Sequence, residues 1–212
     1  MLHAMVSAAG RPRPASAPVT TAGPTLRTLQ RCYLVGQRVK LRGSGFTPQV
    51  PYDIALSGVD FGQSLTDANG DLAASLIPGG LGAGQIQSVD ALSASDGTHR
   101  AATRFTLTRS TGALFGPGGG TSPRRRVPFR VWDLAPQGPP VRVYLHYVRP
   151  SGRPGPSVAL GTTTGQCGTV AVTRPLFAFT PGPGTWTLQF DTQARYRPRP
   201  AGKVARLGVV VG

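Results

Sequence analysis

Apolar and polar residues alternate with a period of two along much of this chain. In one such segment Val39 and Leu41 are separated by Lys40 and followed by Arg42. The same alternation recurs over residues 52–56, 72–76, 127–131, 141–147 and 186–190. Because successive side chains of a strand point to opposite faces of a sheet, this pattern predicts strands that bury one face. Gly and Pro, which break helices and favour turns, supply 50 of the 212 residues, so we predict an all-β fold of short strands.

Segments of the first half recur in the same order in the second half. Residues 39–49 align with residues 127–137 at a constant offset of 88. Two further aligned pairs follow, residues 52–56 with 141–145 and residues 69–73 with 167–171. Three pairs in one order favour the tandem duplication of a unit close to the ~100 residues of a sandwich domain.

The predicted organisation is a disordered tail followed by two immunoglobulin-like β-sandwich domains. The tail, residues 1–28, is rich in Pro, Ala and Thr, a composition that does not form a core. The first sandwich is predicted over residues 29–109 and the second, basic one over residues 110–212. The length of the chain favours two domains, because domains cluster at roughly 100 to 150 residues.

Three turn motifs in the first half point to a known family. They are Gly-Ser-Gly-Phe-Thr-Pro at residues 43–48, Asp-Ala-Asn-Gly-Asp-Leu at 67–72 and Ser-Asp-Gly-Thr at 95–98. Over about 80 residues the first half resembles bacterial immunoglobulin-like surface repeats of the IPT kind, and the second half resembles them more loosely. The resemblance implies a secreted or surface-attached spacer or binding module, without a cofactor and usually without enzymatic activity. It transfers no functional residue, because the shared positions are structural.

Positive charge is concentrated in the second half. The chain has 21 arginines and two lysines against eight aspartates and no glutamate, which gives a net charge of +15. Residues 29–109 have a balance of +1, whereas residues 110–212 have a balance of +11. Two explanations are open: a polyanionic partner, or a GC-rich genome that favours Arg, Gly, Ala and Pro. An electrostatic partner is expected to prefer the second half.

A group of arginines in the second half is the candidate anion-binding surface. Its members are Arg124, Arg125, Arg126, Arg130, Arg142, Arg149 and Arg153. Trp132, Tyr144 and Tyr147 are interspersed among them. Guanidinium groups pair with phosphates in two-pronged geometry and stack on aromatic rings, so this mixture suits an anionic polymer. The alternative is a solvated strand face and its adjoining loop.

The two cysteines, Cys32 and Cys167, have no metal-binding spacing. A zinc site of the Cys/His type needs four ligands at close, characteristic spacings, and none is present. Either the two cysteines form a disulfide, which would imply an oxidising compartment and hold the two domains at a fixed angle, or they are two free, buried thiols.

The residues predict no catalytic, cofactor or metal site. No Gly-x-Ser-x-Gly elbow is present, and His146, which belongs to no motif, is expected at the surface or rim. Asp67, Asn69 and Asp71 have the spacing that begins a calcium loop, but such a loop ends in a glutamate and this chain has none. We expect a hairpin turn there. A triad assembled in space from distant residues stays open.

We expect a non-enzymatic, secreted or cell-surface module with a structural or adhesive role. Its predicted partner is an anionic cell-envelope polymer, contacted by the basic second domain, or another surface protein. No run of about 18 apolar residues predicts a membrane-spanning helix, and no leader peptide is evident. Two alternatives are open: a nucleic-acid-binding protein that uses the same arginines, or accessory domains of a larger enzyme.

Overall fold

The computed structural model describes residues 23–116, 122 and 125–212. All the elements of regular secondary structure named in these residues are β-strands. The first of two sandwiches contains β1 (Thr25–Thr28), β2 (Cys32–Leu34), β3 (Val39–Ser44), β4 (Pro51–Leu56), β5 (Val59–Leu65), β6 (Leu72–Leu76), β7 (Gln87–Ser95) and β8 (Arg100–Thr108). These strands form one sheet in the order β1-β3-β6 and another in the order β2-β8-β7-β4-β5. The predicted all-β class is confirmed.

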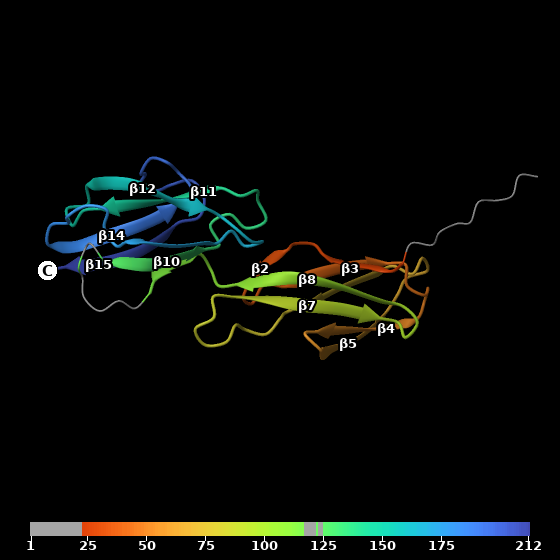
Figure 1. Cartoon of the computed structure of the whole chain (residues 1–212). Helices are drawn as coiled ribbons and strands as arrows, with labels where there is room; N and C mark the ends of the chain where they lie inside the picture. Colours follow the sequence, from red (N-terminus) through yellow and green to blue (C-terminus); the bar gives the residue numbers. More distant parts are fainter. Residues whose placement is uncertain (1–22, 117–121, 123–124) are drawn as a thin grey trace, which may run out of the picture.

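The second sandwich follows directly along the chain. It contains β9 (Gly112–Phe115), β10 (Arg126–Trp132), β11 (Arg142–Val148), β12 (Pro154–Thr162), β13 (Val170–Pro175), β14 (Gly184–Asp191) and β15 (Ala205–Val211). Its sheets have the orders β13-β10-β9 and β12-β11-β14-β15. The two sandwiches lie end to end, and the C-terminus is at the end far from the junction (Figure 1).

The strand order is that of an immunoglobulin-like fold in both sandwiches. In the first, β1, β3 and β6 take the A, B and E positions of one sheet, and β5, β4, β7 and β8 take the C′, C, F and G positions of the other. In the second, β9, β10 and β13 face β12, β11, β14 and β15 in the same arrangement. β2, which pairs in parallel with β8, has no counterpart among the described residues of the second sandwich.

Each sandwich encloses its own hydrophobic core. On β3, Val39 and Leu41 are buried while Lys40 and Arg42 are exposed, as the alternation predicts. The largest core side chains of the first sandwich are Tyr33, Phe46, Tyr52 and Phe105. Those of the second are Phe129, Tyr147, Phe177, Trp186 and Phe190. These aromatic rings bury large apolar areas between the two sheets, which is the main stabilisation available to a sandwich of this size.

The segments that align in the sequence occupy equivalent strands. β3, β4 and β6 take the same positions in the first sandwich as β10, β11 and β13 in the second. The loops after β3 and β10 also share their backbone conformation. Gly45 and Gln49 have φ angles of 80° and 56°, and the residues 88 positions later, Asp133 and Gln137, have 60° and 62°. The origin of this likeness in a tandem duplication stays a prediction.

Two expectations about the first sandwich were wrong. Residues Thr25–Thr28, placed in the disordered tail, form β1 and pair with β3, because Leu26 has a place in the core. Residues 1–22 of that tail lie outside the described residues. The turn at Asn69-Gly70 is not a hairpin, since it connects β5 of one sheet to β6 of the other. In the part of the chain that the structure describes, no helix is long and apolar enough to cross a membrane.

Candidate functional site

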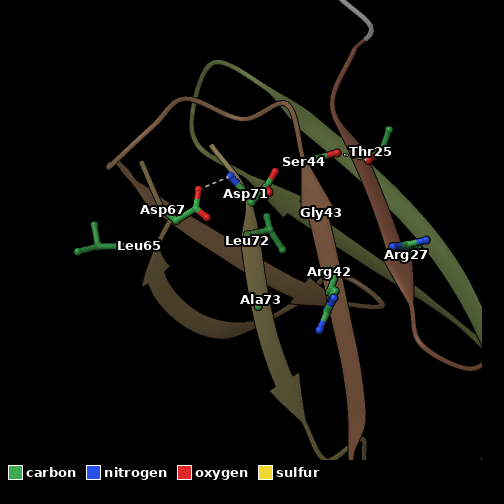
Figure 2. Close-up of a pocket in the computed structure, with 10 residues that line it drawn as sticks. All are labelled: Thr25, Arg27, Arg42, Gly43, Ser44, Leu65, Asp67, Asp71, Leu72 and Ala73. Carbon is green, nitrogen blue, oxygen red and sulfur yellow. Dashed lines mark hydrogen bonds between the residues drawn. The ribbon is translucent and has the colours of Figure 1, made fainter. Parts of the chain in front are cut away.

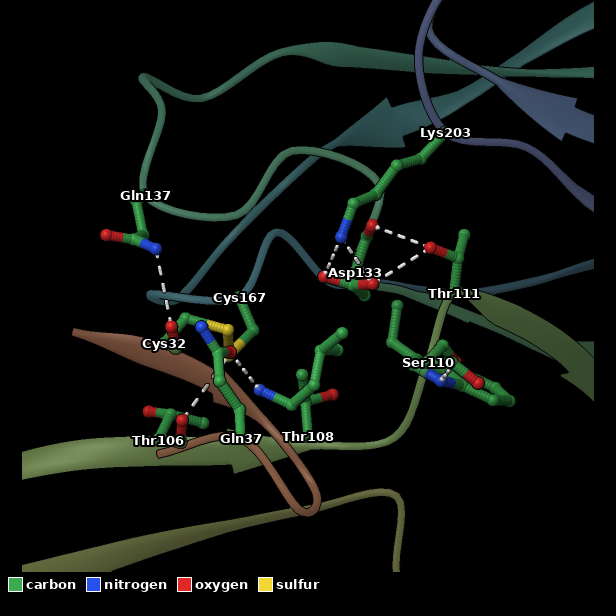
Figure 3. Close-up of polar contacts among 12 residues, drawn as sticks. Cys32, Gln37, Thr106, Thr108, Ser110, Thr111, Asp133, Gln137, Cys167 and Lys203 are labelled. Carbon is green, nitrogen blue, oxygen red and sulfur yellow. Dashed lines mark hydrogen bonds and ion pairs between the residues drawn. A yellow bond between two sulfur atoms is a disulfide. The ribbon is translucent and has the colours of Figure 1, made fainter. Parts of the chain in front are cut away.

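A disulfide joins the two sandwiches. Cys32 lies on β2, and Cys167 lies shortly before β13. Their Cα atoms are 5.3 Å apart, and both side chains are buried (Figure 3). Of the two alternatives for these cysteines, the disulfide is the one that the structure shows. Because disulfides persist in oxidising compartments, the bridge fits a protein that functions outside the cytosol.

Side-chain hydrogen bonds cross the same junction. Gln137 Nε2 donates to the carbonyl oxygen of Cys32 over 3.3 Å, and Gln87 Nε2 donates to Thr169 Oγ1 over 2.9 Å. The chain passes from one sandwich to the other through residues 109–111, between β8 and β9. The disulfide, the hydrogen bonds and this short connection together restrict the rotation of one sandwich against the other.

A buried carboxylate beside the junction is paired with a lysine. Asp133 follows β10 and is 1% exposed. Lys203 Nζ lies 2.6 Å from each of its carboxylate oxygens, and Thr111 Oγ1 donates to Oδ2 over 2.8 Å (Figure 3). Charge-assisted hydrogen bonds of this kind are the strong ones in proteins. The end of β10 is thereby tied both to the segment before β15 and to the connection between the sandwiches.

The predicted arginine surface is divided, and its first part lies on β10. Arg126 and Arg130 alternate there with Val127 and Phe129, which point into the core. Both arginines are therefore exposed on the outer face of the sheet β13-β10-β9. Arg126 Nη2 also donates to the carbonyl oxygen of Thr173 over 2.7 Å, so part of its hydrogen-bonding capacity is already used.

The other predicted arginines lie elsewhere on the second sandwich. Arg142 begins β11, in the opposite sheet, and Arg149 and Arg153 flank the turn between β11 and β12. All three are exposed, as is Arg125 just before β10. Arg124 lies outside the described residues. The structure thus places the described members of this group on two opposite faces and one end of the sandwich, and not on one surface.

His146, expected at the surface or rim, is completely buried. Its ring lies on the outer side of the sheet β12-β11-β14-β15. There it stacks on Tyr144, with ring centroids 6.4 Å apart, and meets the edge of Tyr196 at 5.9 Å. The prediction was wrong because the connection between β14 and β15, which carries Tyr196, folds back over this face of the sheet.

The hydrogen bonds of His146 determine where its proton lies. Nε2 is 3.2 Å from Asp191 Oδ1 and 3.0 Å from the carbonyl oxygen of Gln193. Both of those atoms are acceptors, so Nε2 is the donor. Nδ1 lies 2.7 Å from Ser157 Oγ. A serine, a histidine and an aspartate are thus linked in space, which the sequence left open. Ser157 lies within the edge strand β12 and not on a sharp turn. We therefore interpret the linkage as one that anchors the connection between β14 and β15 to the sheet.

Asp191 is the charged end of this network. Burial raises its pKa, but hydrogen bonds from His146, from the backbone N–H of Gln193 and from Gln189 outweigh burial and leave the pKa below its ordinary value. The Gln193 N–H and Gln189 Nε2 each donate to the carboxylate over 2.8 Å. The carboxylate of Asp191 is therefore ionised at neutral pH.

Asp133 and Asp191 are the only acidic residues of the second half. Both are buried, with 1% and 0% of their surface exposed, and both are engaged in the hydrogen bonds described above. Among the described residues of the second sandwich, the exposed ionised side chains are therefore all basic. This separation of charge by depth leaves the positive charges at the surface and the two negative ones inside.

A groove of about 740 Å³ runs along the outer face of the sheet β1-β3-β6. Arg27 and Arg42 are paired in register on β1 and β3, and Asp67 and Asp71 line the same groove (Figure 2). Asp67 Oδ1 accepts the N–H groups of Asn69 and Asp71 over 2.8 and 2.9 Å, which closes the turn. No group of three potential metal ligands occurs in the described part of the chain. The groove carries both signs of charge and favours no one class of ligand.

A second group of basic residues was not predicted from the sequence. Arg195, Arg197 and Arg199 are exposed in the connection between β14 and β15, residues 192–204, which we call the basic loop. The signal was present as an Arg-x-Arg-x-Arg run. Unlike the first group, this run lies in a segment without strand-like alternation, so the sequence does not assign it to a surface.

Comparisons with known proteins leave the family open. No family model matches the chain, and no curated protein matches it. Among solved structures, the human OSCAR ligand-binding domain is 13% identical, with a TM-score of 0.34, and the match covers 90% of this chain and 99% of that one. The native conformation of E. coli alpha-2-macroglobulin is 11% identical, with a TM-score of 0.30, covering 88% and 16%. The immunoglobulin-like assignment rests on the strand order of this chain, and the resemblance to IPT repeats stays a prediction.

Proposed function

We propose that this chain is a non-enzymatic, secreted or cell-surface binding module in which two immunoglobulin-like sandwiches form one stiff unit. The second sandwich binds an anionic polymer of the cell envelope. The observation that carries this proposal is the burial of both carboxylates of the second half, which leaves the exposed ionised side chains of its described part uniformly basic. Binding to a polyanion releases its condensed counter-ions, so such a surface gains affinity without a deep pocket.

The junction supports a location outside the cytosol. The disulfide between Cys32 and Cys167 is buried between the sandwiches, and a bridge of this kind is retained where thiols are oxidised. An extracellular basic module meets anionic envelope polymers at high local concentration. This favours an envelope polymer over intracellular nucleic acid as the partner.

Binding of a fluorescent poly(glycerol phosphate) to the full chain, followed by fluorescence anisotropy across a series of salt concentrations, tests the proposal. We expect the logarithm of the binding constant to fall linearly with the logarithm of the salt concentration. A neutral dextran of the same size serves as the control and should not bind. Absence of binding, or binding that salt does not weaken, would contradict the proposal.

A separate experiment tests the non-enzymatic part. Ser157 is exposed and hydrogen-bonded to His146, so a fluorophosphonate probe would label it if the network activated its hydroxyl. We expect no labelling above the level of a Ser157→Ala variant, and no difference between the two proteins in hydrolysis of p-nitrophenyl acetate. Labelling that disappears in the variant would show instead that the second sandwich carries a nucleophile.

A further inference from the structure

The basic loop, residues 192–204, is fixed to the sheet beneath it by hydrogen bonds to its backbone. Gln189 Nε2 donates to the carbonyl oxygen of Arg197 over 2.9 Å. Arg206 Nη2 donates to the carbonyl oxygen of Pro198 over 2.7 Å. His146 Nε2 lies 3.0 Å from the Gln193 carbonyl oxygen. The loop is therefore held at its start and at its middle by side chains of three different strands.

The anchoring side chains form one row across the sheet. His146 on β11 is paired in register with Ser157 on β12 and with Gln189 on β14, and Gln189 is paired with Arg206 on β15. Each member bonds to its neighbour or to the loop, including Arg206 Nε, which donates to Gln189 Oε1 over 3.0 Å. Such a row leaves the loop little freedom to rearrange.

The anchored loop turns its arginines outward. Arg195, Arg197 and Arg199 are exposed, whereas Tyr196 between the first two is half-buried against His146. Lys203, the remaining cation of the loop, is held by Asp133. Three guanidinium groups are thus presented at alternate positions of one short segment whose backbone is already ordered. An ordered backbone reduces the entropy lost when a ligand binds.

We propose that the basic loop is the site at which a phosphodiester polymer docks on this protein, and this assignment rests on the proposed function. Guanidinium groups match phosphate oxygens with two parallel hydrogen bonds, so three of them in succession suit a chain that repeats one phosphate per unit. Tyr196 lies between Arg195 and Arg197 in the sequence, and its half-buried ring offers apolar surface to the units between phosphates. The arginines on β10 and at the β11–β12 turn contribute only to the general positive field.

Two variants with equal loss of charge test this assignment in the full chain. The loop variant carries Arg195→Gln, Arg197→Gln and Arg199→Gln. The matched control carries Arg130→Gln, Arg149→Gln and Arg153→Gln. Each is titrated with poly(glycerol phosphate) at several salt concentrations, and circular dichroism checks that the fold is retained. We expect the loop variant to lose affinity about tenfold or more and its salt slope to fall by about 2, while the control changes about threefold or less.

The outcomes separate this inference from the proposed function. If the unmodified chain does not bind the polymer, the proposed function fails. If it binds and both variants lose affinity equally, or the control loses more, the function stands but the basic loop is not the docking site. If poly-glutamate of matched charge binds as tightly as poly(glycerol phosphate), the loop recognises charge alone and the phosphodiester assignment is overturned.

Discussion

The two sandwiches share a strand plan and differ most in how their F and G strands are connected. In the first, β7 and β8 are joined by residues 96–99, and in the second, β14 and β15 are joined by residues 192–204. An aspartate lies at the start of each connection: Asp96 is the first residue after β7, and Asp191 is the last residue of β14. An aspartate near the end of the F strand therefore supports a tight turn in one sandwich and a long loop in the other.

In both sandwiches a hydrogen-bonded aspartate holds the start of the F–G connection, whether that connection is short or long. Asp96 accepts the backbone N–H groups of Thr47 and Thr98 over 2.6 and 2.9 Å. Burial raises its pKa, but these hydrogen bonds and those from His99 outweigh burial and hold the pKa well below its usual range. Asp191 is stabilised in the same way by Gln193, Gln189 and His146. Because a hydrogen-bonded aspartate fixes the start of each connection, the rest can lengthen without losing its attachment.

The largest expected effect comes from removing the second of these aspartates. Asp191→Ala removes the acceptor of the Gln193 N–H and one of the two acceptors of His146 and of Gln189, all in a buried site, and we expect a loss of about 3 to 5 kcal/mol of unfolding free energy. Asp96→Ala should lose less, because the Asp96 carboxylate is equally buried but two of its donor residues, Thr98 and His99, are exposed or partly exposed, so water can replace the lost acceptor. Urea denaturation of both variants measures the difference. Equal losses would show that burial of the network does not distinguish the two connections.

The next largest effect concerns the junction between the sandwiches. Replacing Cys32 and Cys167 by Ser should lower the unfolding free energy by about 2 to 4 kcal/mol, since the bridge closes a loop with a sequence separation of 135. It should also uncouple the two cores, so that one denaturation transition becomes two. Calorimetry of the variant detects this directly. A single transition at an unchanged temperature would show that the hydrogen bonds at the junction suffice to couple the sandwiches.

The sequence was sufficient to predict what depends on one strand at a time. Alternation identified the buried residues of β3 and β10, and the spacing of Cys32 and Cys167 excluded a zinc site and left a disulfide as one of two alternatives. The burial of His146 could not be predicted in the same way, because it depends on a distant connection folding back over β11. The prediction that the arginines form one surface was wrong for a related reason. Alternation tells which side of a strand Arg130 or Arg142 takes, but it does not tell which of two sheets the strand joins.

A smaller effect is expected from Tyr147 in the core of the second sandwich, which should make stability depend on pH in the alkaline range. Burial raises the pKa of Tyr147 to about 12, partly offset by the backbone N–H of Ala178 and the charge of Arg174, while its hydroxyl donates to the Leu176 carbonyl oxygen. In the unfolded chain the phenol ionises near pH 10. Its contribution is therefore complete below about pH 10 and is lost as pH rises toward 12, by about 2 kcal/mol. Tyr147→Phe should flatten the pH dependence of stability in that window, and a slope as steep as that of the unmodified chain would refute this assignment.

The smallest expected effect is the contribution of one hydrogen bond at the junction. It can be separated from the backbone strain of the loop, because both sandwiches have a left-handed residue at the equivalent position. Gln49 and Gln137 have left-handed φ angles of 56° and 62°, and their backbone N–H groups donate to the carbonyl oxygens of Asp67 and Gln166. Changing either to Gly relieves the same backbone strain, at a similar entropic cost in the unfolded chain. Only Gln137→Gly also removes the hydrogen bond to Cys32, so it should be less stable than Gln49→Gly by about 1 kcal/mol. Urea denaturation of the pair measures this difference. If the two variants change equally, the hydrogen bond from Gln137 to Cys32 adds nothing to stability.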